Sequence, residues 1–225
     1  MRTVKVVELV EDFDLYPRTR VDSAHVSQIA EALVAGATLP PLVVETPSLR
    51  IIDGFHRARA LRRVYGDEAT AEVIEKRCKT PGIAFKMAME LNAAHGRALA
   101  PFDRTHCILR GGSLGLTMTQ IGEALHMTQE CVDRMQETRV GRMRSVGTYG
   151  TNAVALKRTV AHMANRVLTK AQCEANGKLS GMQQQFYVNQ VILLIENDML
   201  DKENEKLMER LAHLAELLES LVVEV

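Results

Sequence analysis

Hydrophobic and polar residues alternate in two different ways along the N-terminal third of the chain. Helical spacing of apolar residues over Asp22–Ala35, with a polar start and Gly36 as the stop, predicts a helix. A second helix is predicted over 55–65, directly after Gly54. Short runs rich in β-branched residues, bounded by turn residues, predict strands at 4–9, 42–45, 51–52 and 71–74. This part is therefore predicted to be an α+β domain.

Beyond about residue 81 the strand pattern disappears. Helical spacing of apolar residues predicts helices over 84–92, 101–109 and 153–168. The segment 139–150 is rich in Gly and Arg and is predicted to be a loop or linker. The rest of the chain is therefore predicted to be all-α.

The C-terminal tail carries a heptad pattern. From about Gln183, leucine falls at every seventh residue, at Leu193, Leu200, Leu207, Leu214 and Leu221. A second series, which includes Asn197 and Asn204, falls four residues after each leucine. Leucine at d with asparagine at a is typical of a coiled coil, so one long helix and a homodimer through about 190–225 are predicted. A terminal helix packed on its own domain is the alternative that the pattern leaves open.

The overall charge is neutral, but its distribution is uneven. The 225 residues hold 28 Lys and Arg and 28 Asp and Glu. Residues 100–182 hold 11 basic against 6 acidic side chains, whereas residues 183–225 hold 3 against 9. A localised basic surface attracts a phosphate backbone. A mildly basic solvated helical surface is the competing interpretation.

Several functional classes find no support in the sequence. No apolar run approaches the roughly 18 residues of a membrane span, and the N-terminus lacks the apolar core of a secretory signal. The four cysteines form no CxxC pair and no His cluster joins them, so neither a metal site nor a disulfide framework is expected. Free thiols in a reducing cytoplasm are the expectation.

The first motif with chemical potential begins with Asp53-Gly54-Phe55-His56-Arg57 and lies where a strand gives way to a helix. Glycine permits a tight turn and close approach of a ligand. The exposed N–H groups at a helix start favour an anion, and His56 and Arg57 can donate hydrogen bonds to phosphate oxygens. A strand–helix turn with a solvated basic face is an equally open interpretation.

The second motif is Asn92-Ala93-Ala94-His95-Gly96, just after a predicted helix. Asn92 and His95 offer adaptable donors and acceptors, and Gly96 is a suitable helix stop. Taken alone, this motif is explained more simply as a satisfied helix end.

Together with Leu39-Pro40-Pro41, the two motifs resemble the N-terminal domain of the ParB/sulfiredoxin superfamily over about residues 4–135. The pattern is most similar to ParB-like regulators of antibiotic clusters and to ParB-like phage and plasmid proteins. The resemblance implies a ParB/Srx-like α+β domain. It also implies a nucleotide or phosphate site at Gly54, His56, Arg57, Asn92, His95 and Gly96.

Members of the superfamily carry out several different reactions. The positions at which this sequence departs from the superfamily motifs favour some of these reactions over others. Phe55 stands where sulfiredoxins place their catalytic cysteine, so thiol reduction is not expected. Partition proteins of the superfamily bind CTP, but Leu91 replaces an expected acid, which disfavours hydrolysis. CTP or ATP with Mg²⁺ is therefore the implied cofactor. Free-serine kinases keep a similar turn, which makes Asp53 and His56 candidate catalytic residues and leaves open whether the chain is an enzyme.

The segment Thr119–Met135 predicts two short helices with a tight turn near His126. This spacing is typical of a helix-turn-helix unit, whose second helix enters the major groove. A plain helical hairpin is the alternative, because His126 replaces the usual glycine and acids share the second helix. The predicted DNA contacts are Thr128, Gln129, Arg134, Arg139, Arg142, Arg144, Lys157 and Arg158.

The sequence thus predicts a ParB/Srx-like domain at 1–98, a helix-turn-helix region at 99–150 and a helical C-terminal region at 151–225. The predicted function is a DNA-binding regulator or partition-type protein, gated by a nucleotide. Its expected partners are double-stranded DNA and a second copy of itself, and its expected location is the cytoplasm at the nucleoid. A small-molecule kinase and a non-enzymatic phage or plasmid accessory protein are the alternatives.

Overall fold

The computed structural model describes residues 2–94, 98–144 and 151–223. Contacts between residues group the chain into two compact units, Met1–Gly181 and Met182–Val225. The predicted boundaries near residues 98 and 150 both lie inside the first unit. Among the described helices, none combines the length and the apolar character that crossing a bilayer would need.

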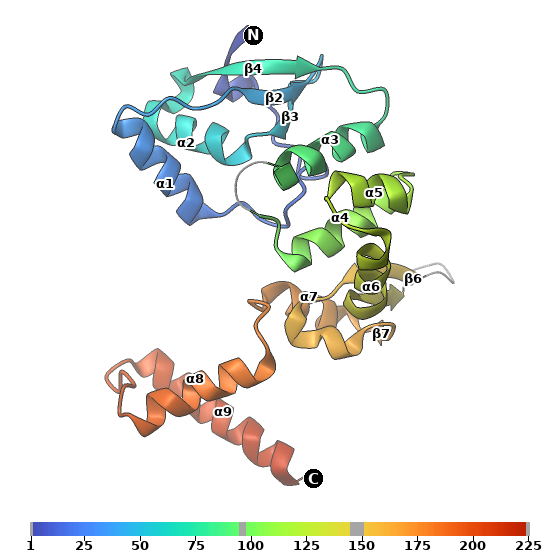
Figure 1. The fold of residues 1–225 in the computed structure, drawn as a ribbon. Helices are drawn as coiled ribbons and strands as arrows, with labels where there is room; N and C mark the ends of the chain where they lie inside the picture. Colours follow the sequence, from blue (N-terminus) through green and yellow to red (C-terminus); the bar gives the residue numbers. More distant parts are fainter. Residues whose placement is uncertain (1, 95–97, 145–150, 224–225) are drawn as a thin grey trace. The chain divides into compact units, whose positions relative to one another are not determined.

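The N-terminal part is a four-stranded sheet with helices packed beneath it (Figure 1). The sheet order is β1 (Arg2–Lys5), β4 (Thr70–Lys76), β2 (Leu42–Glu45) and β3 (Arg50–Asp53). β4 runs parallel to β2 and antiparallel to β1, and β2 and β3 form an antiparallel pair. The predicted strand at 4–9 is wrong in its second half, because the 3₁₀ helix η1 (Val6–Glu8) follows β1.

The two helices predicted in this domain are present. α1 (Ser23–Val34) begins after Asp22, whose carboxylate accepts hydrogen bonds from the backbone N–H groups of the first turn. α2 (Phe55–Tyr65) has the predicted bounds and starts directly after Gly54. A further 3₁₀ helix, η2 (Gly66–Glu68), leads into β4. The sheet and α2 share a buried core that includes Val44, Ile51 and Phe55.

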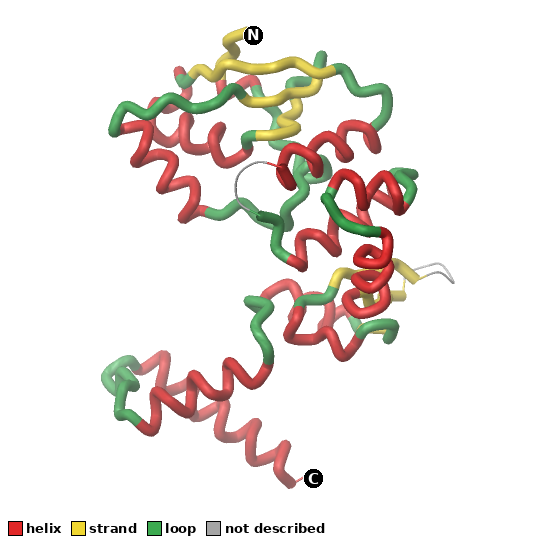
Figure 2. The backbone as a smooth tube through the Cα atoms, viewed as in Figure 1, coloured by secondary structure: helices red, strands yellow, loops and turns green. Residues whose placement is uncertain are grey.

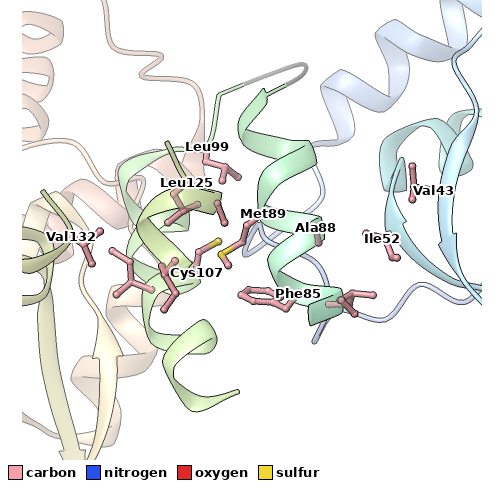
Figure 3. Packing of buried hydrophobic residues seen from close by; sticks show 14 residues of the cluster. Val43, Ile52, Phe85, Ala88, Met89, Leu99, Cys107, Leu125 and Val132 are labelled. Atoms are coloured by element: carbon pink, nitrogen blue, oxygen red, sulfur yellow. The ribbon is translucent and has the colours of Figure 1, made fainter. Parts of the chain in front are cut away.

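Four helices follow the sheet: α3 (Pro81–Ala94), α4 (Pro101–Ser113), α5 (Met118–Ala124) and α6 (Gln129–Arg139). α3 lies between the sheet and the other helices (Figure 3). Phe85 and Met89 of α3 are fully buried there, with Ile52 on the sheet side and Cys107 on the α4 side. One continuous core therefore joins the α/β domain to the helices that follow.

The prediction of an all-α C-terminal half is wrong. Segment 139–150, predicted as a loop, contains the strand β5 (Val140–Arg144). Segment 153–168, predicted as a helix, includes the end of β6 (Thr151–Ala155) and all of η3 (Arg158–Met163) and β7 (Val167–Leu168). β5 is the central strand, antiparallel to β6 and parallel to β7. Figure 2 shows these strands in yellow after the run of red helices. α7 (Lys170–Lys178) closes the first unit.

The second unit consists of two helices, α8 (Gln184–Glu196) and α9 (Glu205–Val223). The prediction of one long helix from about Gln183 is therefore wrong. Asn197 ends α8, Asp198 has a positive φ of 52°, and the side chain of Asn204 accepts a hydrogen bond from the N–H of Leu207 at the start of α9. The two asparagines that were predicted at buried seam positions instead end one helix and begin the other.

Candidate functional site

The turn between β3 and α2 depends on Gly54. This residue has φ 111° and ψ 20°, a backbone conformation that side chains with a Cβ rarely adopt. A Cβ built at this position would lie 2.3 Å from Cδ2 of Leu42, which is buried in the sheet. The sequence motif therefore folds as predicted, with the helix start brought close against the sheet.

Arg57 points back toward the sheet side of the turn. Its Nη1 donates hydrogen bonds to the carbonyl oxygens of Pro40 and Pro41, at 2.8 and 2.9 Å, and its Nη2 lies 2.5 Å from Oδ2 of Asp53. Both partners of this ion pair are largely covered, with 17% and 25% of their side-chain surfaces exposed. Arg57 thus joins three parts of the predicted site and also occupies the carboxylate of Asp53.

His56 lies in a different environment, between α1 and the N-terminal segment. Its Nε2 accepts a hydrogen bond of 3.1 Å from the backbone N–H of Asp22, and its ring packs against that of His25, with centroids 4.9 Å apart. Burial lowers the pKa of His56 to about 4, and the positive charges of His25 and Arg18 act in the same direction. His56 is therefore neutral near pH 7 and offers a ring nitrogen as a hydrogen-bond acceptor to α1.

Tyr16 lies beside His56 and was not predicted as a site residue. Its ring stacks on Phe55, with centroids 4.3 Å apart, and only 2% of the residue is exposed. The hydroxyl has no hydrogen-bond partner among the residues that the structure describes. Burial raises the pKa of Tyr16 to about 12.

The remaining arginines of α2 point away from the turn. Arg59 pairs with Glu11, with its Nη2 2.5 Å from Oε2, Arg62 lies 3.3 Å from Asp67, and Nη1 of Arg63 donates to Ser27 at 2.8 Å. These three arginines, with Glu11 and the apolar residues of η1, line an open groove of about 600 Å³. The positive charges of these three arginines therefore lie at this groove and not at the predicted phosphate site.

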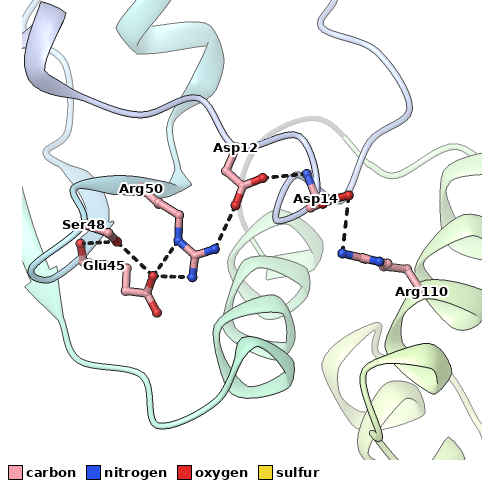
Figure 4. Close-up of polar contacts among 6 residues, drawn as sticks. All are labelled: Asp12, Asp14, Glu45, Ser48, Arg50 and Arg110. Carbon is pink, nitrogen blue, oxygen red and sulfur yellow. Dashed lines mark hydrogen bonds and ion pairs between the residues drawn. The ribbon is translucent and has the colours of Figure 1, made fainter.

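A second network of charged residues fixes the N-terminal segment (Figure 4). Arg50 donates to Glu45 through Nε, at 2.7 Å, and to Asp12 through Nη1, at 2.8 Å. Asp12 in turn accepts a hydrogen bond from the backbone N–H of Asp14, and Asp14 lies 3.4 Å from Arg110 of α4. This chain of contacts links the sheet edge to the helices that follow it.

The second motif is described only in part. The side chain of Asn92, in the last turn of α3, donates a hydrogen bond of 2.9 Å to the carbonyl of Ala88. His95 and Gly96 lie outside the described residues. The assignment of Asn92, His95 and Gly96 to a nucleotide site stays a prediction.

The two helices at 118–139 are joined by a tight turn. Thr117 caps α5 in a capping box with Gln120, and Thr128 caps α6 by accepting the N–H of Cys131. His126 has φ 53°, the left-handed conformation for which glycine is usually selected. Gly122 brings the helices close, because a Cβ there would lie 3.0 Å from the carbonyl oxygen of Met127.

The exposed face of α6 carries a mixture of charges. Gln129, Asp133 and Arg134 are exposed, and the amide of Gln129 donates to Asp133 at 2.8 Å. Nη2 of Arg134 lies 3.6 Å from Sγ of Cys131. The exposed acids on this face are Glu130, Asp133 and Glu137.

The other predicted DNA contacts fall on the second sheet and its surroundings. Arg142 and Arg144 of β5 and Arg158 of η3 are exposed, whereas Arg139 is half-buried at the end of α6. Lys157 is directed inward. Its ammonium group donates to the carbonyls of Gly177, in the last turn of α7, and of Leu179, just after it, and lies 5.2 Å from the centre of the Phe102 ring. Lys157 therefore closes the C-terminal end of α7.

No metal-binding group of three or more His, Cys, Asp or Glu side chains occurs among the described residues. The four cysteines are free thiols, and burial raises the pKa of the most enclosed of them, Cys107. Its Sγ donates to the carbonyl of Pro17 at 3.1 Å, which ties α4 to the N-terminal segment.

The strand–glycine–helix turn and the helix pair after it are the features that carry the resemblance to ParB-like proteins. No protein-family model matches the chain. Over 87 residues, or 39% of its length, the chain is 36% identical to the transcriptional regulator NovG of Streptomyces niveus. It covers 26% of that protein, so it spans about a quarter of the length of this relative.

Solved structures of ParB proteins are also similar to the chain. The C-terminally truncated ParB of Caulobacter crescentus bound to the centromeric parS site has 15% identity and a TM-score of 0.44, over 59% of this chain and 68% of that chain. The same protein complexed with CTP-γ-S has 15% identity and a TM-score of 0.37, over 58% of this chain and 73% of that chain. A pNOB8-like ParB N-domain has 13% identity and a TM-score of 0.39, over 68% of this chain and 52% of that chain. The chain is similar to proteins of the ParB type, which is the class that the motifs indicated.

Proposed function

We propose that the chain is a DNA-binding regulator or partition-type protein of the ParB-like class. The observation that carries the proposal is the α5–α6 pair, with its tight turn at His126 and with Gln129 and Arg134 exposed on α6. Gln and Arg side chains match the adenine and guanine edges of the major groove. The sequence similarity to a transcriptional regulator supports the same conclusion.

Nucleotide gating is the second part of the proposal, and the turn at Gly54 is the site proposed for it. The first turn of α2 carries no acidic side chain and has no side-chain cap, so its N–H groups are suited to an anion. Arg57 holds this turn to Asp53, and we propose that it acts there as a positioning residue. CTP or ATP with Mg²⁺ is the proposed ligand, and a change in DNA binding is its proposed effect.

The kinase alternative has no specific support among the described site residues, because the carboxylate of Asp53 is already paired with Arg57. The paired oxygen, Oδ2, would have to exchange its contact with Arg57 before it could accept a proton from a substrate hydroxyl.

The proposed regulator is a homodimer formed through the second unit. α8 contains no buried residue, and α9 exposes Leu214, Leu217, Leu218 and Leu221. A pair of helices this short lacks a core of its own, and association with a second copy would supply one. Two reading helices related by a two-fold axis would match a near-palindromic DNA site.

The decisive experiment is selection of DNA fragments. Sheared genomic DNA is incubated with the purified chain at near-physiological salt, without nucleotide, with CTP and with ATP, and the bound fragments are sequenced. Enrichment of a few discrete sites is the expected result, with a change on adding nucleotide. Uniform recovery of all fragments in every condition would contradict the proposal.

Two variants distinguish a residue proposed to contact bases from a residue proposed to contact phosphates. Replacement of Arg134 by Ala removes a proposed base contact and should relax the sequence preference at one position of the site. Replacement of Arg158 by Ala removes an exposed charge and should weaken binding to all fragments alike. Equal effects of both variants on all fragments would assign α6 to a structural role only.

A further inference from the structure

The small sheet after α6 belongs to a segment without acids. Residues 138–173 contain seven Arg and Lys and no Asp or Glu. In the N-terminal domain, by contrast, arginines such as Arg50, Arg57 and Arg59 are paired with carboxylates. Positive charge in this part of the chain is therefore not neutralised by neighbours in sequence.

Strand β5 separates its residues onto two faces of the sheet. Gly141 is buried on one face, where a Cβ would lie 2.3 Å from Cδ1 of Leu168. Arg142 and Arg144 alternate with the residues of that face and are exposed. Within the described parts of the chain, neither guanidinium takes part in an ion pair or a side-chain hydrogen bond with the protein.

The exposed face around these two arginines carries short side chains. In the antiparallel pairing, Arg142 lies opposite Ala153 and Arg144 lies opposite Thr151, and both partners are exposed. On the other side, Arg142 is level with Val167, which is 53% exposed. An extended polyanion such as a DNA backbone can therefore approach both guanidinium groups closely.

The sheet is attached firmly to the helix pair. β5 begins where α6 ends, and the N–H of Leu156 donates to the carbonyl of Arg139 at 2.8 Å. Asn165 bonds to the carbonyls of Glu137 and Val140, at 3.0 and 2.8 Å. The position of β5 relative to α6 is thus set by two backbone hydrogen bonds and by the side-chain amide of Asn165.

We propose that the β5–β6 hairpin is a second DNA-contacting element, which binds phosphates through Arg142 and Arg144 beside the groove that α6 reads. This inference rests on the proposed DNA-binding function. It assigns sequence discrimination and affinity to two different elements, α6 and the hairpin. The acids Glu130, Asp133 and Glu137 on α6 oppose a phosphate backbone, so α6 discriminates between sequences more than it contributes affinity. The hairpin supplies sequence-independent affinity and with it the salt dependence.

The test compares salt dependence in three full-length proteins. Binding to a fluorescent duplex is measured between 0.05 and 0.3 M salt for the wild type, for Arg142→Gln/Arg144→Gln, and for a charge-matched control, Arg77→Gln/Lys79→Gln, whose residues are exposed between β4 and α3. The slope of log K against log salt is negative, and each lost phosphate contact makes it less steep by about 0.9. The hairpin variant should therefore lose about two units of slope and roughly 10- to 100-fold in affinity at 0.1 M salt.

The ratio of affinities for preferred and scrambled duplexes should stay the same in the hairpin variant, because phosphate contacts carry no sequence information. An unchanged slope in a hairpin variant with wild-type circular dichroism and melting temperature would overturn the inference, and so would an equal loss in the control. If the wild type prefers no duplex, the regulator proposal fails, but the slopes still decide whether the hairpin binds phosphate.

Discussion

The guanidinium of Arg57 lies 2.5 Å from the carboxylate of Asp53, four residues earlier, and also bonds to the carbonyls of Pro40 and Pro41. Arg57 therefore holds together the end of β3, the start of α2 and the loop before β2. Both charged groups were predicted to act on a ligand. Their mutual contact means that the turn is organised before any ligand binds.

Replacement of Arg57 by Ala should destabilise the protein. The variant leaves Asp53 and two carbonyls without their donor in a largely covered site, at a cost of about 2–3 kcal/mol in the free energy of unfolding. Urea unfolding followed by circular dichroism measures this. Replacement of Arg62 by Ala is the control, because its ion pair with Asp67 is exposed and is expected to contribute less than about 1 kcal/mol. Equal losses in both variants would disprove the structural role of Arg57.

Replacement of Gly54 by Ala should also lower stability, for two separable reasons. Ala would have to adopt φ 111°, and its Cβ would meet Leu42 at 2.3 Å. Replacement of Gly36 by Ala is the matched control, since Gly36 has φ 89° with open space around it. The control should cost about 1–2 kcal/mol through the backbone alone, and Gly54→Ala clearly more. Equal melting temperatures of the two variants would show that the contact with Leu42 is easily relieved.

His56 should make stability depend on pH below neutrality. Burial lowers its pKa to about 4 from the ordinary 6.5, so between these values the unfolded chain binds more protons than the folded chain. The stabilising effect of the neutral ring is present above pH 6.5 and is lost as the pH falls toward 4. Replacement of His56 by Gln should flatten this dependence without abolishing it, because burial also lowers the pKa of His106. Titration of the histidine ring protons by NMR would give the pKa directly, and a value near 6.5 would contradict the buried placement.

The bounds of α2 and β2 followed from the sequence because local and tertiary preferences agree there. Leu42–Glu45 is a β-branched run between prolines and a turn, and Phe55–Tyr65 follows a glycine that can only be a turn. The second sheet was missed because its strands are at most five residues long and contain Ala, Asn, Gly and Arg, which favour no strand locally. Pairing with β6 and β7, and not local preference, makes β5 a strand.

In the C-terminal tail, by contrast, the sequence pattern predicted more regular structure than is present. Its leucine spacing continues across Asn197–Asn204, although the helix does not. Asn and Asp side chains compete for backbone hydrogen bonds and so favour helix ends over helix interiors. In the candidate site, the closeness of Asp53 and Arg57 on either side of the predicted strand–helix turn was the available signal for their ion pair. No comparable signal in the sequence linked His56 to His25 or to Asp22, because those contacts depend on how α1 packs on α2.

Replacement of His126 by Gly should stabilise the α5–α6 turn. His126 adopts φ 53°, a conformation that costs a residue with a Cβ about 1 kcal/mol and glycine almost nothing. The expected gain is a fraction of this figure, since glycine also gains freedom in the unfolded chain. His126→Ala is the control and should show no gain. A lower melting temperature for His126→Gly than for His126→Ala would contradict the left-handed conformation of this residue, and lower melting temperatures for both variants than for the wild type would mean that the imidazole itself makes a stabilising contact.

If the second unit forms the proposed dimer, exposed leucines of α9 should hold the two copies together. Leu218 and Leu221 of α9 are 50% and 61% exposed, and burying such side chains against a second copy would contribute about 1.5–3 kcal/mol each when complete. Replacement of both by Glu should convert a dimer into a monomer in sedimentation equilibrium and weaken binding to a palindromic DNA site more than to a half-site. The control adds two acids at polar positions of the same helix, His213→Glu and Ser220→Glu, and should remain dimeric. A wild type that sediments as a monomer at tens of micromolar would exclude a second copy as the occupant of this apolar face, and loss of the dimer in the control would assign the effect to charge and not to the leucines.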